Sequence, residues 1–246
     1  MVNSQNKLVG LIVSNWNELR VISRKYRSTD IVSRTGKYCR SLSVGNTKII
    51  AIESGVGIKN ARTAANELIN IYKPDIIINA GIAGALHPEI EVGVVVVGEW
   101  VYSIKKNMKI SLSCKLNSKF QNVIFGGILT NNKFVDLGTT KKCLYDKTGA
   151  SVVDMETWGI AEICHKAGKR LLAVKSVSDT SSDDTPRFGH ILNKNSSLKY
   201  GVAARYFASN PFLLYKYIQF RYVNMKKAVS SLNDFIIRFL NRDYCE

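Results

Sequence analysis

The sequence has no hydrophobic run long enough to cross a membrane. The longest apolar stretches, residues 76–86 and 92–97, fall short of the roughly 18 residues that a membrane-spanning helix needs. Both are typical of buried strands instead. The first residues also lack the small-residue cleavage pattern of an export signal, so we expect a cytoplasmic protein.

Cysteine and histidine do not occur in metal-binding or disulfide-forming patterns. The five cysteines are odd in number and widely scattered: Cys39, Cys114, Cys143, Cys164 and Cys245. The three histidines, His87, His165 and His190, are isolated. This spacing fits neither a disulfide framework nor a zinc site, so we expect reduced cysteines, no metal and no cofactor.

Acidic residues are few. The chain has 35 Lys and Arg against 19 Asp and Glu, a net charge of +16. Such a surplus favours an anionic partner, either nucleic acid or an acidic membrane surface, although a merely basic soluble surface explains it equally well. Residues 191–246 hold nine basic and three acidic side chains among Tyr, Phe and Leu.

The remaining composition is that of an ordinary folded domain, with 246 residues of which 46% are hydrophobic and 22% charged. Apolar runs alternate with helically periodic segments, which predicts an α/β fold with a mixed or mostly parallel sheet. Strands are predicted at residues 8–13, 48–53, 75–79, 93–97, 123–130, 151–153 and 171–177. Helices are predicted at residues 18–26, 58–72 and 157–166, the second stopping before Pro74.

The C-terminal part differs in pattern. Residues 104–118 and 178–187 are polar and predict loops, and residues 199–207, 211–222 and 225–240 predict basic helices. No domain boundary is drawn at residue 190, because these helices are suited to covering one sheet face. We therefore expect a single domain, residues 1–246, with a basic helical C-terminal segment, residues 190–246.

Two glycine-bearing segments follow predicted strands. Gly55 and Gly57 stand between a strand and a helix, and Gly81 and Gly84 lie in a predicted turn over residues 79–86. Missing side chains let a ligand approach the backbone, although a tight structural turn explains either segment as well. The third glycine and the ribose-binding acid of a dinucleotide site are absent, which counts against NAD. Turns at the carboxyl ends of two strands would face one crevice.

Carboxylates also lie where strands end. Asp154 and Glu156 follow one predicted strand and open a helix, and Ser178 and Asp179 follow another. Glutamate is favoured in a first helical turn whether or not it has a function. A carboxylate where a buried strand meets a loop is nevertheless well placed to act on a ligand.

These pieces resemble the purine nucleoside phosphorylase and methylthioadenosine/adenosylhomocysteine nucleosidase superfamily over roughly residues 8–187. The resemblance rests on four segments in the expected order and spacing: residues 54–57, 79–86, 154–156 and 177–179. Within the superfamily, residues 81–88 and 142–157 look closest to the hopanoid-associated phosphorylases, also called adenosylhopane nucleosidases. The resemblance implies a three-layer αβα sandwich of phosphorylase/hydrolase type with a mixed central sheet, assembled as a homo-oligomer.

The resemblance also implies roles for single residues. Asp179 would donate to, or bridge to, the purine N7, which near neutrality requires that burial raise its pKa. Glu156 would bind ribose hydroxyls and stabilise the oxocarbenium-like state, with Met155 packing on the sugar. Glu18 would orient an attacking water, although a surface salt bridge explains this residue as well. The other expected substrate-binding residues are Gly55, Gly57, Gly81, Ala83, Gly84, Asp154 and Ser178.

The attacking nucleophile stays open. Phosphorolytic relatives carry an arginine and a hydroxyl residue where this chain has Asn79 and Ile82, which favours water over phosphate. Nucleosidases carry an arginine four residues before the catalytic aspartate, and this chain has Lys175 there, which lacks the bidentate fork. Arg62 or Lys59 is an alternative anion-binding group.

The predicted activity is release of adenine from a nucleoside with a large apolar 5′ substituent, such as adenosylhopane, in hopanoid biosynthesis. Two alternatives are a methylthioadenosine/adenosylhomocysteine nucleosidase and a non-catalytic relative that binds nucleic acid or an anionic membrane. The expected partners are a purine nucleoside, phosphate if the reaction is phosphorolytic, and a second copy of the chain. Asp179→Asn is expected to abolish base release with little loss of stability.

A stripe of apolar and basic residues marks the C-terminal segment: Phe212, Leu213, Leu214, Lys216, Tyr217, Ile218, Phe220, Arg221 and Tyr222. A basic amphipathic helix of this kind can lie on anionic lipid, which would place the protein at the inner face of the membrane. Packing against the sheet or a sister subunit is the alternative. Trp16 and Tyr145 are weaker candidates for stacking on a base.

Overall fold

The computed structural model describes residues 7–112, 116, 120–184, 201, 205, 208, 209 and 211–241. Within these residues no helix is both long and apolar enough to span a bilayer. Cys114, Cys245, His190 and all of the helix predicted at residues 199–207 except residues 201 and 205 lie outside the described residues.

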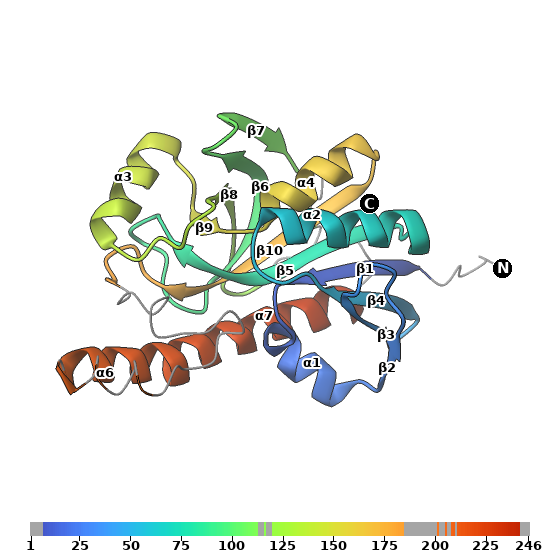
Figure 1. The fold of residues 1–246 in the computed structure, drawn as a ribbon, viewed down its shortest axis with the longest axis horizontal. Coiled ribbons are helices and arrows are strands. Elements are labelled where there is room, and N and C mark those ends of the chain that lie inside the picture. Colours follow the sequence, from blue (N-terminus) through green and yellow to red (C-terminus); the bar gives the residue numbers. More distant parts are fainter. Residues whose placement is uncertain are drawn as a thin grey trace.

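A mixed sheet forms the centre of the fold (Figure 1). Its strands are β1 (Leu8–Val13), β2 (Ser28–Ile31), β3 (Tyr38–Val44), β4 (Thr47–Glu53), β5 (Ile76–Ala85), β6 (Val95–Ser103), β7 (Met108–Ser111), β8 (Val123–Thr130), β9 (Val152–Asp154) and β10 (Arg170–Asp179). The strand order is β10-β6-β8-β9-β5-β1-β4-β3-β2, with β7 beside β6. Because β10 also pairs with β5, strands β10, β6, β8, β9 and β5 close into a ring.

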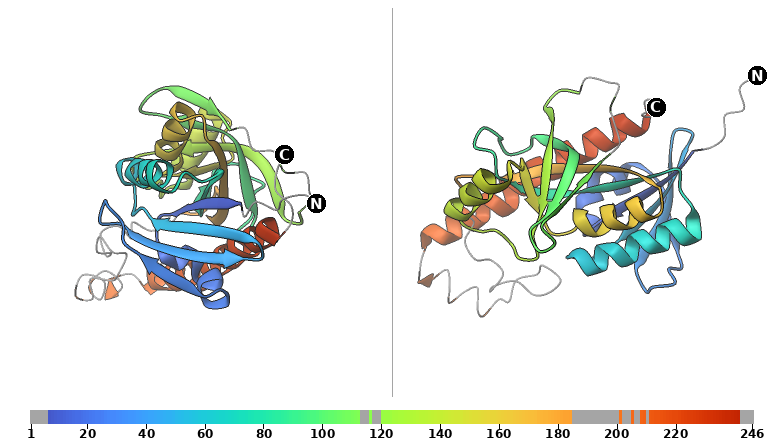
Figure 2. Two further views of the ribbon diagram at one scale, coloured as in Figure 1. Left: turned by 90° about the vertical axis from the view of Figure 1, so that its right-hand side faces the viewer. Right: turned by 90° about the horizontal axis from the view of Figure 1, so that it is seen from above.

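Helices cover both faces of the sheet, which confirms the predicted three-layer αβα sandwich (Figures 1 and 2). The helical elements are η1 (Trp16–Leu19), α1 (Arg20–Lys25), α2 (Ile58–Glu67), η2 (Leu68–Tyr72), α3 (Gly138–Thr148), α4 (Thr157–Lys166), α6 (Pro211–Ile218), η4 (Gln219–Asn224) and α7 (Met225–Asn241). Helices α2 and α4 lie side by side on one face, and α1 and α7 lie on the other. Helix α3 stands at the end where β5 and β10 finish.

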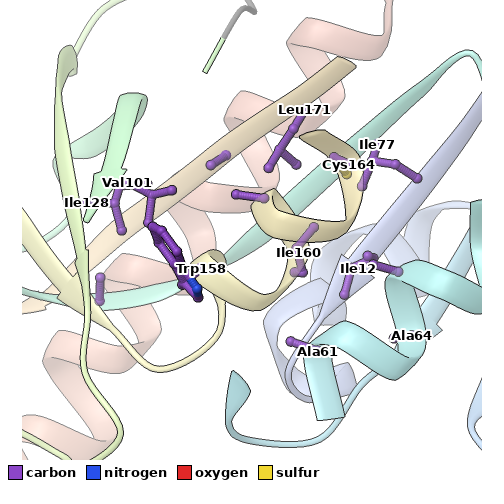
Figure 3. Close-up of a cluster of buried hydrophobic side chains, with 14 of the residues drawn as sticks. Ile12, Ala61, Ala64, Ile77, Val101, Ile128, Trp158, Ile160, Cys164 and Leu171 are labelled. Atoms are coloured by element: carbon purple, nitrogen blue, oxygen red, sulfur yellow. The ribbon is translucent and has the colours of Figure 1, made fainter. Parts of the chain in front are cut away.

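The larger hydrophobic core lies between the sheet and the α2–α4 layer (Figure 3). Ile12 and Ile77 come from the sheet, and Trp158 and Ile160 come from α4. Gly159 lets α4 approach α2 closely, because a Cβ there would lie 2.5 Å from the carbonyl oxygen of Ile58. The α2–α4 pair therefore fixes the start of α4, where the acidic segment 154–156 stands.

A second core lies on the opposite face and is completed by α7. Leu232, Phe235, Ile236, Phe239 and Leu240 of this helix are buried, and the helix contacts strands β3, β5, β6 and β10. Residues 225–241 therefore belong to the folded core. The prediction that the C-terminal helices cover a sheet face is confirmed for α7.

Predicted helices match the structure closely, because apolar spacing and Pro74 fix their ends locally. The turn predicted at residues 79–86 is wrong: residues 79–85 continue strand β5. The loop predictions are wrong for residues 108–111, which form β7, and for Ser178 and Asp179, which end β10. Pairing with β10 holds the Gly- and Ala-rich half of β5 in a sheet, overriding its weak strand propensity. Strands β2 and β3 and helix α3 were not predicted.

Candidate active site

Neighbouring strands β5 and β10 carry the centre of the candidate site. They run parallel, with Lys175 opposite Gly81 and Asp179 opposite Gly84. A Cβ at Gly81 would lie 3.1 Å from the Lys175 Nζ, and one at Gly84 would lie 2.9 Å from the Asp179 Oδ2. The two glycines therefore leave the room into which the Lys175 and Asp179 side chains extend.

Lys175 is a buried cation, 1% exposed, among several carboxylates. Its Nζ lies 2.9 Å from Asp154 Oδ2 and donates to Asn79 Oδ1 at 3.4 Å. Burial lowers the pKa of Lys175, but the charges of Asp154, Glu156 and Glu18 outweigh that effect and raise it above its usual value. Lys175 is therefore a fixed positive charge that holds these acids together.

Asp154 is the main partner of Lys175 and is saturated with donors. Its Oδ1 accepts from Thr130 Oγ1 at 2.8 Å, and its Oδ2 accepts from the Thr157 N–H at 3.0 Å and Thr157 Oγ1 at 2.5 Å. Asn79 Nδ2 in turn donates to Thr157 Oγ1 at 2.7 Å. In this geometry Asp154 holds Lys175, Thr130 and Thr157 in place. Its expected contact with substrate stays a prediction.

Glu156 lies at the start of α4 and is bound to the first glycine turn. Its Oε1 accepts from the N–H of Gly57 at 2.7 Å, and its Oε2 accepts from the N–H of Met155 at 3.3 Å. Burial and the nearby Asp154 carboxylate raise the pKa of Glu156 to about 7. The backbone N–H of Gly57 thus binds a carboxylate of the protein itself. Gly55 and Gly57 have φ of +77° and +99°, which suits glycine.

Glu18 is buried on η1, so the alternative of a surface salt bridge is wrong. Its carboxylate accepts from the Ser14 N–H at 2.8 Å, Ser14 Oγ at 2.9 Å and the Asn15 N–H at 3.2 Å. Burial raises the pKa of Glu18, and Lys175 opposes that rise. Its Oε1 would lie 3.6 Å from a Cβ at Gly81, which places this carboxylate beside strand β5.

Asp179 is held by a lysine that the sequence analysis did not identify. Lys141 of α3 is fully buried, and its Nζ lies 2.5 Å from Asp179 Oδ2. The same Nζ donates to the carbonyl oxygens of Thr180 at 2.7 Å and Asp183 at 3.1 Å. Ser178 Oγ donates to Asp179 Oδ1 at 2.6 Å. Lys141 is followed by Lys142 in a polar helix, so no sequence pattern distinguished it from a surface residue.

Several weaker candidates have other partners. Arg62 forms an ion pair with Glu162. The rings of His87 and Tyr145 meet edge to face at 5.0 Å. Trp16 lies beside Tyr38, with its ring under Arg40. Lys59 lines a cleft of about 490 Å³. The cleft is also bordered by Val56, Gly57, Ile58, Asn60, Arg62, Ser103, Lys105, Lys106, Asn132 and Trp158.

The arrangement separates two kinds of chemistry along β5. Glu18 and Lys175 lie beside Gly81, and Glu156 is close enough to both to interact with their charges. Asp179 lies beside Gly84, three residues or about 10 Å further along the strand. A carboxyl group whose pKa lies near neutrality can accept or donate a proton or bind hydroxyls. Within the described residues no group of three or more His, Cys, Asp or Glu is arranged to hold a metal ion.

Comparison with known proteins gives the site a family context. The family model for the phosphorylase superfamily matches residues 9–111 and 111–206. A 5′-methylthioadenosine/S-adenosylhomocysteine nucleosidase of Buchnera aphidicola subsp. Acyrthosiphon pisum is 30% identical over 160 residues, covering 55% of this chain and 69% of that protein. The nucleosidase of Buchnera aphidicola subsp. Baizongia pistaciae is 26% identical over 222 residues, covering 79% of this chain and 88% of that protein.

Solved structures extend the similarity of fold. The 5′-methylthioadenosine/S-adenosylhomocysteine nucleosidase of S. pneumoniae, determined with a transition-state inhibitor, superposes with a TM-score of 0.69. It is 18% identical, and the match covers 95% of this chain and 98% of that one. The arrangement of sheet and helices is thus common to both proteins.

Proposed function

The chain belongs to the phosphorylase superfamily, and on this premise we propose that it is an enzyme that cleaves the N-glycosidic bond of a purine nucleoside and releases the base. The observation that carries the proposal is the placement of buried acids at two points along β5: Glu18 beside Gly81, with Glu156 within reach of its charge, and Asp179 beside Gly84. Cleavage of this bond needs anionic groups at the sugar and an acid at the base.

Asp179 acts at the base. As the C1′–N9 bond breaks, negative charge develops on the purine. Asp179, protonated in the complex with substrate, neutralises that charge by a hydrogen bond from its carboxyl group to N7 or by giving its proton to N7. Lys141 and Ser178 fix the orientation of this carboxyl group through contacts of 2.5 and 2.6 Å. The Lys141 contact makes Lys141 a positioning residue for Asp179.

Glu156 and Glu18 act at the sugar. Glu156 binds ribose hydroxyls and stabilises the positive charge that develops on the ring, with Met155 beside the sugar. Glu18 orients a water molecule and takes up its proton while the water oxygen attacks C1′. Burial raises the pKa of Glu18, which makes this carboxylate a stronger base.

Water is the proposed nucleophile. The phosphate-binding groups of phosphorolytic relatives are replaced by Asn79 and Ile82. Lys175 is already paired with Asp154, and Arg62 with Glu162, so neither charge is free for a phosphate ion. A phosphorolytic reaction, which would make the protein a glycosyltransferase, remains the competing proposal, and Lys59, Lys105 and Lys106 on the cleft are its best anion-binding groups.

The proposed substrate is an adenine nucleoside with a large apolar 5′ substituent such as adenosylhopane, which would place the reaction in hopanoid biosynthesis. This choice rests on segments 81–88 and 142–157. The second candidate substrate is methylthioadenosine or adenosylhomocysteine, which the names of the related proteins favour. We place the homo-oligomeric enzyme in the cytoplasm, peripheral to the inner face of the membrane.

The test is adenine release from methylthioadenosine, adenosylhomocysteine and a 5′-alkylated adenosine, each with and without phosphate. A free 5′-substituted ribose as product supports water as nucleophile, and the 1-phosphate of that sugar refutes it. Asp179→Asn should abolish release, whereas Asp146→Asn, an exposed change on α3, should leave it unchanged. Circular dichroism of both variants separates loss of chemistry from loss of fold. No release from any nucleoside would overturn the proposal in favour of a binding protein.

A further inference from the structure

Helices α6 and η4 present a row of exposed apolar side chains. Between 38% and 67% of each of six large residues is exposed: Phe212, Leu214, Tyr215, Ile218, Tyr222 and Val223. Tyr215, Ile218 and Tyr222 follow the i, i+3, i+7 spacing that puts side chains on one face of a helix. We call these six side chains the α6–η4 face. So many large apolar groups exposed together mark a surface for binding another structure.

The opposite side of the same segment holds it to the protein. Tyr217 is buried, η4 contacts β10, and the following helix α7 is part of the core. Helix α6 extends beyond the edge of the sheet (Figure 1). The α6–η4 face is therefore held by the folded body while its apolar side chains remain open to the surroundings.

The sequence that contains α6 and η4 carries charge of one sign. Residues 185–233, 49 in number, contain no Asp or Glu and eight basic residues: Arg187, Lys194, Lys199, Arg205, Lys216, Arg221, Lys226 and Lys227. Lys216 Nζ lies 5.2 Å from the centre of the Phe212 ring. Cations beside exposed aromatic and aliphatic side chains complement a surface that is both anionic and apolar beneath.

We propose that the α6–η4 face docks on an anionic lipid bilayer, with α6 and η4 lying in the plane of the interface. Tyr215 and Tyr222 lie at the level of the headgroups, where aromatic rings with a polar edge are favoured, and the apolar ring of Phe212 inserts at the boundary with the acyl chains. Lys216 and Arg221 contact the lipid phosphates. The inference names the surface behind the membrane association proposed above and does not depend on the nucleosidase reaction, so each can fail without the other.

The test is co-sedimentation of the full chain with vesicles of phosphatidylcholine alone and with vesicles containing phosphatidylglycerol. Binding should require phosphatidylglycerol. Phe212→Ser/Tyr215→Ser should weaken it by about tenfold or more, because two apolar insertions are lost. Both residues are 63% exposed, so the fold should survive. The matched control Val32→Ser/Met108→Ser, at positions 90% and 55% exposed on another surface, should bind like the parent chain.

Three outcomes would overturn the proposal. The first is no binding to vesicles with phosphatidylglycerol. The second is equal vesicle binding by Phe212→Ser/Tyr215→Ser and the parent chain, which would attribute the binding to general charge attraction. The third is self-association: an oligomer in sedimentation velocity that Phe212→Ser/Tyr215→Ser dissociates, without any effect of the change on vesicle binding, would assign the face to a second copy. Adenine release by both variants, measured on soluble methylthioadenosine, tests the reaction separately.

Discussion

Replacing Lys141 with methionine should destabilise the protein far more than the same change at its neighbour Lys142. Lys141 is fully buried and contacts Asp179 Oδ2, while Lys142 is exposed on the same helix. Methionine fills a similar volume but leaves the Asp179 carboxylate buried without its cation. Removing one member of a buried ion pair costs about 3–5 kcal/mol, whereas a surface change costs about 0.5 kcal/mol or less.

The assay is urea unfolding followed by circular dichroism. With an m-value of about 2–3 kcal/mol/M, Lys141→Met should lower the midpoint by about 1–2 M, and Lys142→Met should leave it almost unchanged. The double variant Lys141→Met/Asp179→Asn should be more stable than Lys141→Met alone, because it removes the unpaired charge. Equal midpoints for Lys141→Met and Lys142→Met would refute the reasoning. For the same reason Asp179→Asn alone should cost some stability, contrary to the expectation from sequence.

Three further predictions concern the site. Because folding raises the pKa of Glu156 from 4.5 to about 7, the folded state holds the extra proton, so the free energy of unfolding should fall by up to about 3 kcal/mol as pH rises from about 4.5 through 7. Glu156→Gln should make the free energy of unfolding, measured by urea titration, depend less on pH across this range. An unchanged pH dependence would assign it to another group. Gly84→Ala places a Cβ 2.9 Å from Asp179 Oδ2 and should lower kcat by about 100-fold with the fold retained by circular dichroism, since a displaced catalytic group loses its alignment. Asn233→Ala removes a donor to the Glu18 carbonyl oxygen and should cost about 1–3 kcal/mol in urea unfolding; a change below 0.5 kcal/mol, a threshold of about the size of surface effects, would contradict it.

The sequence by itself determined the features that depend on neighbouring residues in the chain. Periodicity and Pro74 predicted the helix over residues 58–72, and the α4 prediction, residues 157–166, matched to the residue. The ends of apolar runs located Glu156 and Asp179 near the carboxyl ends of strands. These signals are local, because a helix stop, a cap or a buried strand is encoded within a few residues.

Only the tertiary structure decided which polar residues are buried together. Lys141 meets Asp179 across 38 residues of sequence, and residues 79–85 form a strand because β10 pairs with them. The structure also divided the basic C-terminal segment into a core helix, α7, and an exposed apolar face on α6 and η4. Spacing predicted helices in both parts, but whether an apolar stripe is covered depends on elements distant in the chain, which no local pattern records.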